Sequence, residues 1–78
     1  MIKKMWEFVT FEKYGREYVC DFLREYSTDI SYIDGGWIAN LMIKRDGQLV
    51  YSYNLGLLLD EMDETDRTVY EEIISDYN

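Results

Sequence analysis

Carboxylate side chains are concentrated in the last quarter of the 78-residue chain. Residues 1–59 carry eight acids and seven bases, a net charge of −1, whereas residues 60–78 carry eight acids and one base, a net charge of −7. These eight acids are Asp60, Glu61, Asp63, Glu64, Asp66, Glu71, Glu72 and Asp76. Such a group can pair with arginine and lysine side chains of a partner, bind a metal ion, or keep a solvated surface soluble.

The spacing of the acids does not match a metal or catalytic site. A calcium-binding EF-hand loop starting at Asp60 would have Met62 at its third position, and one starting at Asp63 would have Arg67 at its fifth. Glu71 and Glu72 are adjacent, so on a helix they do not face each other as a glycosidase pair would. With no His and one Cys in the chain, we expect no catalytic residue, no metal site and no cofactor.

The overall charge of the chain limits the kind of partner that it can bind. A formal net charge of −8 and a pI near 4.3 oppose direct binding to nucleic acid, because the phosphate backbone is itself anionic. No apolar run approaches the roughly 18 residues that span a membrane. The lone Cys20 lies in an apolar, strand-like run, which is typical of a reducing compartment. We therefore expect a cytoplasmic protein with no membrane contact.

Two hairpins are predicted in the first three quarters of the chain. Alternating apolar and polar residues predict strands at about 5–13, 17–25, 37–45 and 48–54. Tyr14-Gly15 and Asp46-Gly47 supply the two turns. The segment 26–36, which includes Gly35-Gly36, reads as a loop. The last strand, 48–54, could lie at a sheet edge and pair with its own copy in a homodimer.

A C-terminal helix is predicted at about 64–77. Val69, Tyr70, Ile73, Ile74 and Tyr77 form one apolar stripe at helical spacing, and Asp63 or Thr65 can cap its N-terminus. The expectation is one α+β domain over residues 1–78, with a four-stranded, mainly antiparallel sheet and the helix packed on one face.

The stretches Tyr32–Gly47 and Val50–Gly56 carry a resemblance. With the aromatic-rich first hairpin, the Gly-Gly loop and the terminal Tyr77-Asn78, they resemble a family of short uncharacterised proteins encoded by phages and mobile elements of Gram-positive bacteria. The chain has Leu55-Gly56-Leu57 where this family is expected to have Arg-Gly-Trp. The resemblance implies a phage setting and a host-cell cytoplasm, and it implies no activity. By size and acidity the chain is also similar to small acidic anti-CRISPR proteins.

Two functional interpretations remain open at this point. In the first, the protein is a non-catalytic inhibitor whose acidic segment imitates DNA phosphates on a basic nucleic-acid-binding host protein, most specifically a Cas nuclease. In the second, it is a small structural or regulatory binding module, monomeric or homodimeric, whose acids serve only solubility. Under the first interpretation, replacing Asp63, Glu64 and Asp66 with lysine should abolish binding without unfolding the chain.

Overall fold

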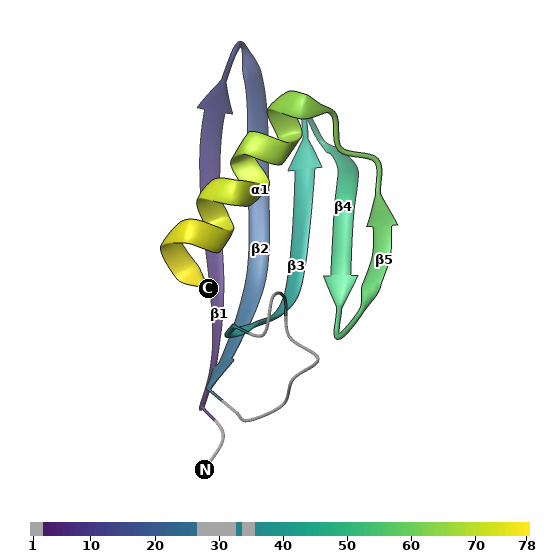
Figure 1. Cartoon of the computed structure of the whole chain (residues 1–78). Helices are drawn as coiled ribbons and strands as arrows, with labels where there is room; N and C mark the ends of the chain where they lie inside the picture. The colour runs from purple at the N-terminus through teal and green to yellow at the C-terminus, as the bar shows by residue number, and fades with distance from the viewer. Residues whose placement is uncertain (1–2, 27–32, 34–35) are drawn as a thin grey trace.

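The chain forms an antiparallel sheet followed by one helix (Figure 1). The computed structural model describes residues 3–26, 33 and 36–78. Each strand pairs with the next, so the order across the sheet is that of the sequence. The elements are β1 (Lys3–Lys13), β2 (Arg16–Tyr26), β3 (Ile38–Arg45), β4 (Gln48–Asn54), β5 (Leu57–Asp60) and α1 (Glu64–Tyr77).

The α+β class and the C-terminal helix are confirmed, but the expected number of strands is wrong. Leu57–Asp60 forms a fifth strand, whose Asp60 lies opposite Tyr51 of β4. Sequence reasoning missed it because it is only four residues long, carries three consecutive leucines without alternation, and runs into the acidic stretch. As a consequence β4 lies inside the sheet, and the strand at that edge is β5. Most of the loop expected at 26–36 lies outside the described residues.

Both predicted hairpin turns are confirmed by their backbone angles. Tyr14 and Gly15 have φ of 52° and 76°, and Asp46 and Gly47 have φ of 50° and 84°. Two successive positive φ values are the signature of the tight turn that matches the twist of antiparallel strands. The Asp46 carboxylate also accepts a hydrogen bond from the Glu17 backbone N–H at 3.0 Å, which ties this turn to the start of β2.

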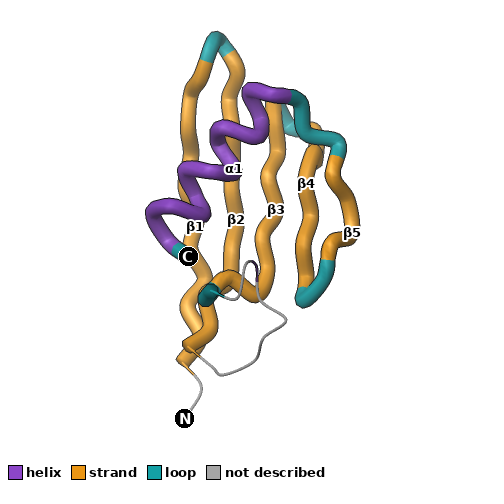
Figure 2. The backbone as a smooth tube through the Cα atoms, viewed as in Figure 1, coloured by secondary structure: helices purple, strands orange, loops and turns teal. Residues whose placement is uncertain are grey.

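Helix α1 covers the sheet face that carries Tyr18, Cys20 and Phe22. Figure 2 shows it running obliquely over β1, β2 and β3, beside the uncovered strands β4 and β5. Val69 and Ile73 on the predicted apolar stripe are fully buried against this face. Burial raises the pKa of the Cys20 thiol to about 12, so this side chain is a core residue and not a nucleophile.

Candidate protein-binding surface and pocket

The eight acids predicted to bind a partner do not form one surface. Asp66 is fully buried, and the expectation that it lies on the surface is wrong. Three others are paired with cations of this chain: Asp60 with Arg67, Asp63 with Arg16 and Arg45, and Glu72 with Lys13. The other four are exposed and have no cation within ion-pair distance among the described residues; they are Glu61, Glu64, Glu71 and Asp76.

Asp66 joins the start of α1 to the sheet. Its Oδ1 accepts a hydrogen bond from the Tyr18 hydroxyl at 2.5 Å, and its Oδ2 accepts one from Arg45 at 2.5 Å. Burial and this hydrogen bond raise the pKa of Tyr18, so its hydroxyl stays a donor. A buried carboxylate is tolerated because its lone pairs are satisfied by such partners. A lysine here would meet Arg45 in a buried space, so the triple lysine substitution would test folding rather than binding.

Asp63 caps the helix through a reciprocal contact with Asp66. The Asp63 carboxylate accepts from the Asp66 backbone N–H at 2.9 Å, and the Asp66 carboxylate accepts from the Asp63 backbone N–H at 3.0 Å. Of the two N-caps considered, Asp63 is therefore the one used, and Thr65 lies within the helix. The Asp66 backbone N–H, and then the Arg16 guanidinium at 2.6 Å, lower the pKa of Asp63 to about 2.

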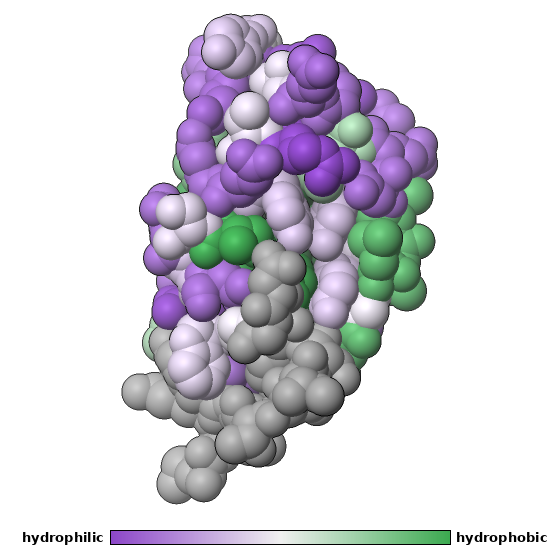
Figure 3. All heavy atoms as spheres, in the orientation of Figure 1, coloured by the Kyte–Doolittle hydropathy of each residue, from purple (hydrophilic) through white to green (hydrophobic). Residues whose placement is uncertain are grey.

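The four exposed and unneutralised acids lie on and just before α1. We refer to Glu61, Glu64, Glu71 and Asp76 as the open acids. Glu64 and Glu71 are seven residues apart and so lie on one side of the helix, about 10 Å apart along its axis. Figure 3 shows hydrophilic residues gathered over the helix and the adjoining end of the sheet. These are the exposed acids of the predicted surface whose charge is not paired with a cation within the described part of the chain.

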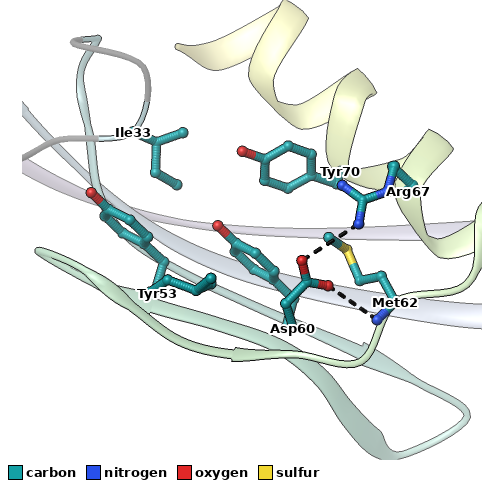
Figure 4. Close-up of a pocket in the computed structure, with 8 residues that line it drawn as sticks. Ile33, Tyr53, Asp60, Met62, Arg67 and Tyr70 are labelled. Atoms are coloured by element: carbon teal, nitrogen blue, oxygen red, sulfur yellow. Dashed lines mark hydrogen bonds and ion pairs between the residues drawn. The ribbon is translucent and has the colours of Figure 1, made fainter.

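A pocket of about 370 Å³ opens beside the helix, over the part of the sheet that α1 leaves uncovered. Its lining comprises Ile33, Tyr51, Tyr53, Leu57, Asp60, Met62, Arg67 and Tyr70. Tyr51 and Ile33 are buried, Tyr53 and Tyr70 are half-buried, and Asp60 and Arg67 are exposed. Figure 4 shows Tyr70 and Arg67 extending from the helix on one side, with Tyr53 and Asp60 on the other. No sequence motif marks this site, because its residues converge from four separate segments of the chain.

Aromatic rings and one ion pair dominate the chemistry of this pocket. The rings of Tyr51 and Tyr70 contact each other with centroids 5.0 Å apart at an angle of 58°. Burial, together with the nearby Tyr70, raises the pKa of Tyr51, so its phenol is neutral at physiological pH. Asp60 accepts a hydrogen bond from the Met62 backbone N–H at 3.2 Å and one from Arg67 at 3.4 Å.

Apolar side chains are exposed along the β5 edge of the sheet. Leu55, Leu57 and Leu58 are 51%, 58% and 68% exposed. Figure 3 shows hydrophobic residues gathered on the side of the molecule where β5 lies. An edge strand also presents unpaired backbone groups, which can pair with another strand. Trp6 and Phe8 of β1 are exposed as well; by register they lie on the face opposite the helix, since Val9 and Phe11 are opposite the core residues Cys20 and Tyr18.

No family model, curated protein or solved structure matches this chain. Its resemblance to phage-encoded proteins therefore stays a prediction. Among the residues described, no helix has the length and apolar character needed to cross a membrane. Within the same residues, no three Cys, Asp or Glu side chains group as a metal site would require.

Proposed function

We propose that this protein is a non-catalytic, phage-encoded inhibitor that binds the basic surface of a host nucleic-acid enzyme, most specifically a Cas nuclease, in place of DNA. The observation that carries the proposal is the division among the acids. Four of them are buried or paired with cations of this chain, whereas the open acids face solvent and have no cation within ion-pair distance among the described residues. The open acids can attract a basic partner over long range and can pair with its arginines on contact.

The spacing of the open acids suits a groove that binds a phosphate backbone. Glu64 and Glu71 are separated by about 10 Å along the helix axis, about three times the 3.4 Å rise per phosphate along one DNA strand. The helix would therefore place negative charge opposite some of the cations in such a groove. The uneven charge of the chain, with −7 of its −8 in residues 60–78, would orient the helix toward that groove as the two proteins approach.

The test is affinity capture of the tagged protein from a lysate of CRISPR-bearing bacteria across a salt series, with duplex DNA as competitor. We expect a DNA-handling protein to be retained at low salt, lost at high salt and displaced by DNA. A fourfold variant, E61Q/E64Q/E71Q/D76N, should bind that partner about tenfold to a hundredfold more weakly, since each exposed pair contributes modestly.

A matched variant distinguishes a defined surface from overall charge. E12Q/E17Q/D21N/D46N removes the same number of negative charges from the strands and the β3–β4 turn, and it should bind like the unmodified protein. An equal loss of affinity in both variants would mean that only the net charge of the chain determines binding. Retention of a partner that neither salt nor DNA displaces would refute the DNA-mimic proposal.

The second candidate is a binding module that pairs through the β5 edge, with the acids serving solubility. Its supporting observation is the exposure of Leu57 and Leu58 on an edge strand. If copies of the chain pair there, light scattering should show a dimer, and Leu58→Lys should convert it to a monomer, because lysine on an edge opposes strand pairing. A monomer at all concentrations would exclude the homodimer.

A further inference from the structure

We propose that the pocket between α1 and strands β4 and β5 binds the guanidinium group of an arginine side chain presented by a protein partner. The residues that carry this inference are Tyr51, Tyr53 and Tyr70, with Asp60 at the rim. That the arginine belongs to a protein partner rests on the proposed function, which calls for a basic one. The preference of the pocket for a cation follows from its own residues.

Three tyrosine rings and a carboxylate favour a cation. The face of an aromatic ring carries partial negative charge and attracts ammonium and guanidinium groups, and several rings lining one pocket reinforce this. Asp60 contributes a full negative charge at the rim. A net charge of −8 on the chain adds long-range attraction for a cation and repulsion for an anion.

The structure already contains one guanidinium at this rim. Arg67 reaches Asp60 with an N···O distance of 3.4 Å, and its side chain is 50% exposed. The contact demonstrates that the Asp60 carboxylate is accessible to a guanidinium from the helix side. A long, half-exposed pair of this kind contributes little to stability, so an incoming arginine that also contacts the rings can replace Arg67 at Asp60.

The size and shape of the site favour arginine over lysine. A volume of about 370 Å³ is near the lower end of ligand pockets and suits one side chain rather than a large cofactor. Guanidinium is flat, weakly hydrated and able to stack on rings while donating two parallel hydrogen bonds to a carboxylate. An ammonium is compact and strongly hydrated, so more favourable solvation is lost when it enters an aromatic pocket.

The test uses the full chain and small probes, with tyrosine ring signals followed by NMR. N-acetyl-arginine methylamide should shift the signals of Tyr51, Tyr53 and Tyr70 in a saturable way. The citrulline analogue has the same shape without the charge and should bind at least about tenfold more weakly, and the lysine analogue should fall between the two. Equal binding of arginine and citrulline, or tighter binding of N-acetyl-glutamate methylamide, would overturn the inference.

Three substitutions in the pocket, with one control outside it, test which residues bind the arginine. Asp60→Asn keeps the acceptor for the Met62 backbone N–H and should weaken arginine binding about tenfold, whereas Glu12→Gln removes an equal charge from a solvent-exposed position outside the pocket and should not. Tyr53→Leu keeps an apolar wall without the ring face and should also weaken binding. Arg67→Gln should strengthen binding several-fold, because it leaves Asp60 without its internal cation. A weakening by Arg67→Gln would mean that Arg67 does not compete with the probe for Asp60, and would refute the proposal.

This inference and the proposed function fail separately. If arginine binds the pocket but no DNA-handling partner is captured, the pocket chemistry stands and the proposed function is wrong. If a partner is captured and Asp60→Asn or Tyr53→Leu leaves its affinity unchanged, the open acids carry the interaction and the pocket does not receive the partner's arginine. Circular dichroism of each variant confirms that the fold is retained before either comparison is made.

Discussion

The carboxylate of Asp66 and the hydroxyl of Tyr18 share a hydrogen bond of 2.5 Å, and both side chains are fully buried. Asp66 is the third residue of α1 and Tyr18 is the third residue of β2. Arg45, at the end of β3, binds the other oxygen of the same carboxylate. One acid of the charged segment therefore fixes the start of the helix against two strands, whereas the open acids face solvent.

Asp66→Asn should destabilise the protein by about 2–3 kcal/mol, because an amide NH2 would replace a buried carboxylate oxygen that accepts from Arg45 and from the Asp63 backbone N–H. Urea unfolding measures the change, with Glu64→Gln as the control because Glu64 is exposed. Tyr18→Phe should cost about 1–2 kcal/mol. The effects of the two substitutions should not add, since they share a hydrogen bond. Additive losses would contradict the coupling inferred from the structure.

Stability should fall as pH drops from about 4 to 2, partly through Asp63. Its pKa is about 2 in the folded protein and about 3.9 in an unfolded chain, so the folded state binds fewer protons in this window. The stabilisation is fully present above pH 4 and is lost as the pH approaches the folded pKa. Unfolding measured at several pH values should show a shallower decline for Asp63→Asn. An unchanged slope would show that other carboxyls account for the loss.

The side chain of Asn78 holds the segment before β3. Its Oδ1 accepts from the backbone N–H groups of Trp37 and Ile38 at 2.8 and 2.9 Å, and its Nδ2 donates to the Ile33 carbonyl at 2.8 Å. Asn78→Ala should therefore cost about 1–3 kcal/mol in thermal or urea unfolding. Gly36→Ala should also destabilise, since a Cβ there would collide with the Asn78 side chain.

The double variant tests whether the Gly36 effect is steric. In the Asn78→Ala background the obstructing amide is gone, so Gly36→Ala should cost less than it does in the unmodified protein. If Gly36→Ala lowered the free energy of unfolding equally in both backgrounds, its effect would come from the backbone conformation and not from the contact with Asn78.

Leu55 is an unfavourable residue for its backbone conformation. Its φ of 53° lies in the left-handed region, which costs a residue with a Cβ about 1–2 kcal/mol. Its side chain is half exposed, so little packing is lost when it is removed. Leu55→Gly should raise the free energy of unfolding by about 1 kcal/mol. Leu58→Gly, within β5, should lower the free energy of unfolding. If both glycine substitutions stabilised the protein, the positive φ of Leu55 would not explain the effect of Leu55→Gly.

Local signals in the sequence were sufficient for the helix and the two hairpins. Helix 64–77 was predicted with its observed bounds because the apolar stripe and an N-cap are encoded within a few residues of each other. Asp46-Gly47 specified its turn because two adjacent residues with positive φ favour those residue types. These features depend on neighbours in the chain, so they can be read without the fold.

The division of the acids depends on contacts across the chain. Asp66 has the same residue type as Asp63 and Asp60, and what separates it is the pair Tyr18 and Arg45, which lie 48 and 21 residues away in sequence. One signal could have revealed it: Asp66 precedes Val69 by three residues and Ile73 by seven, which places it on the buried stripe. The aromatic pocket had no such signal, because strands β4 and β5, the helix and Ile33 form it together. Local sequence preferences determine the individual helix and strands. Which acids are buried or paired with a cation is determined only when elements distant in the sequence pack together.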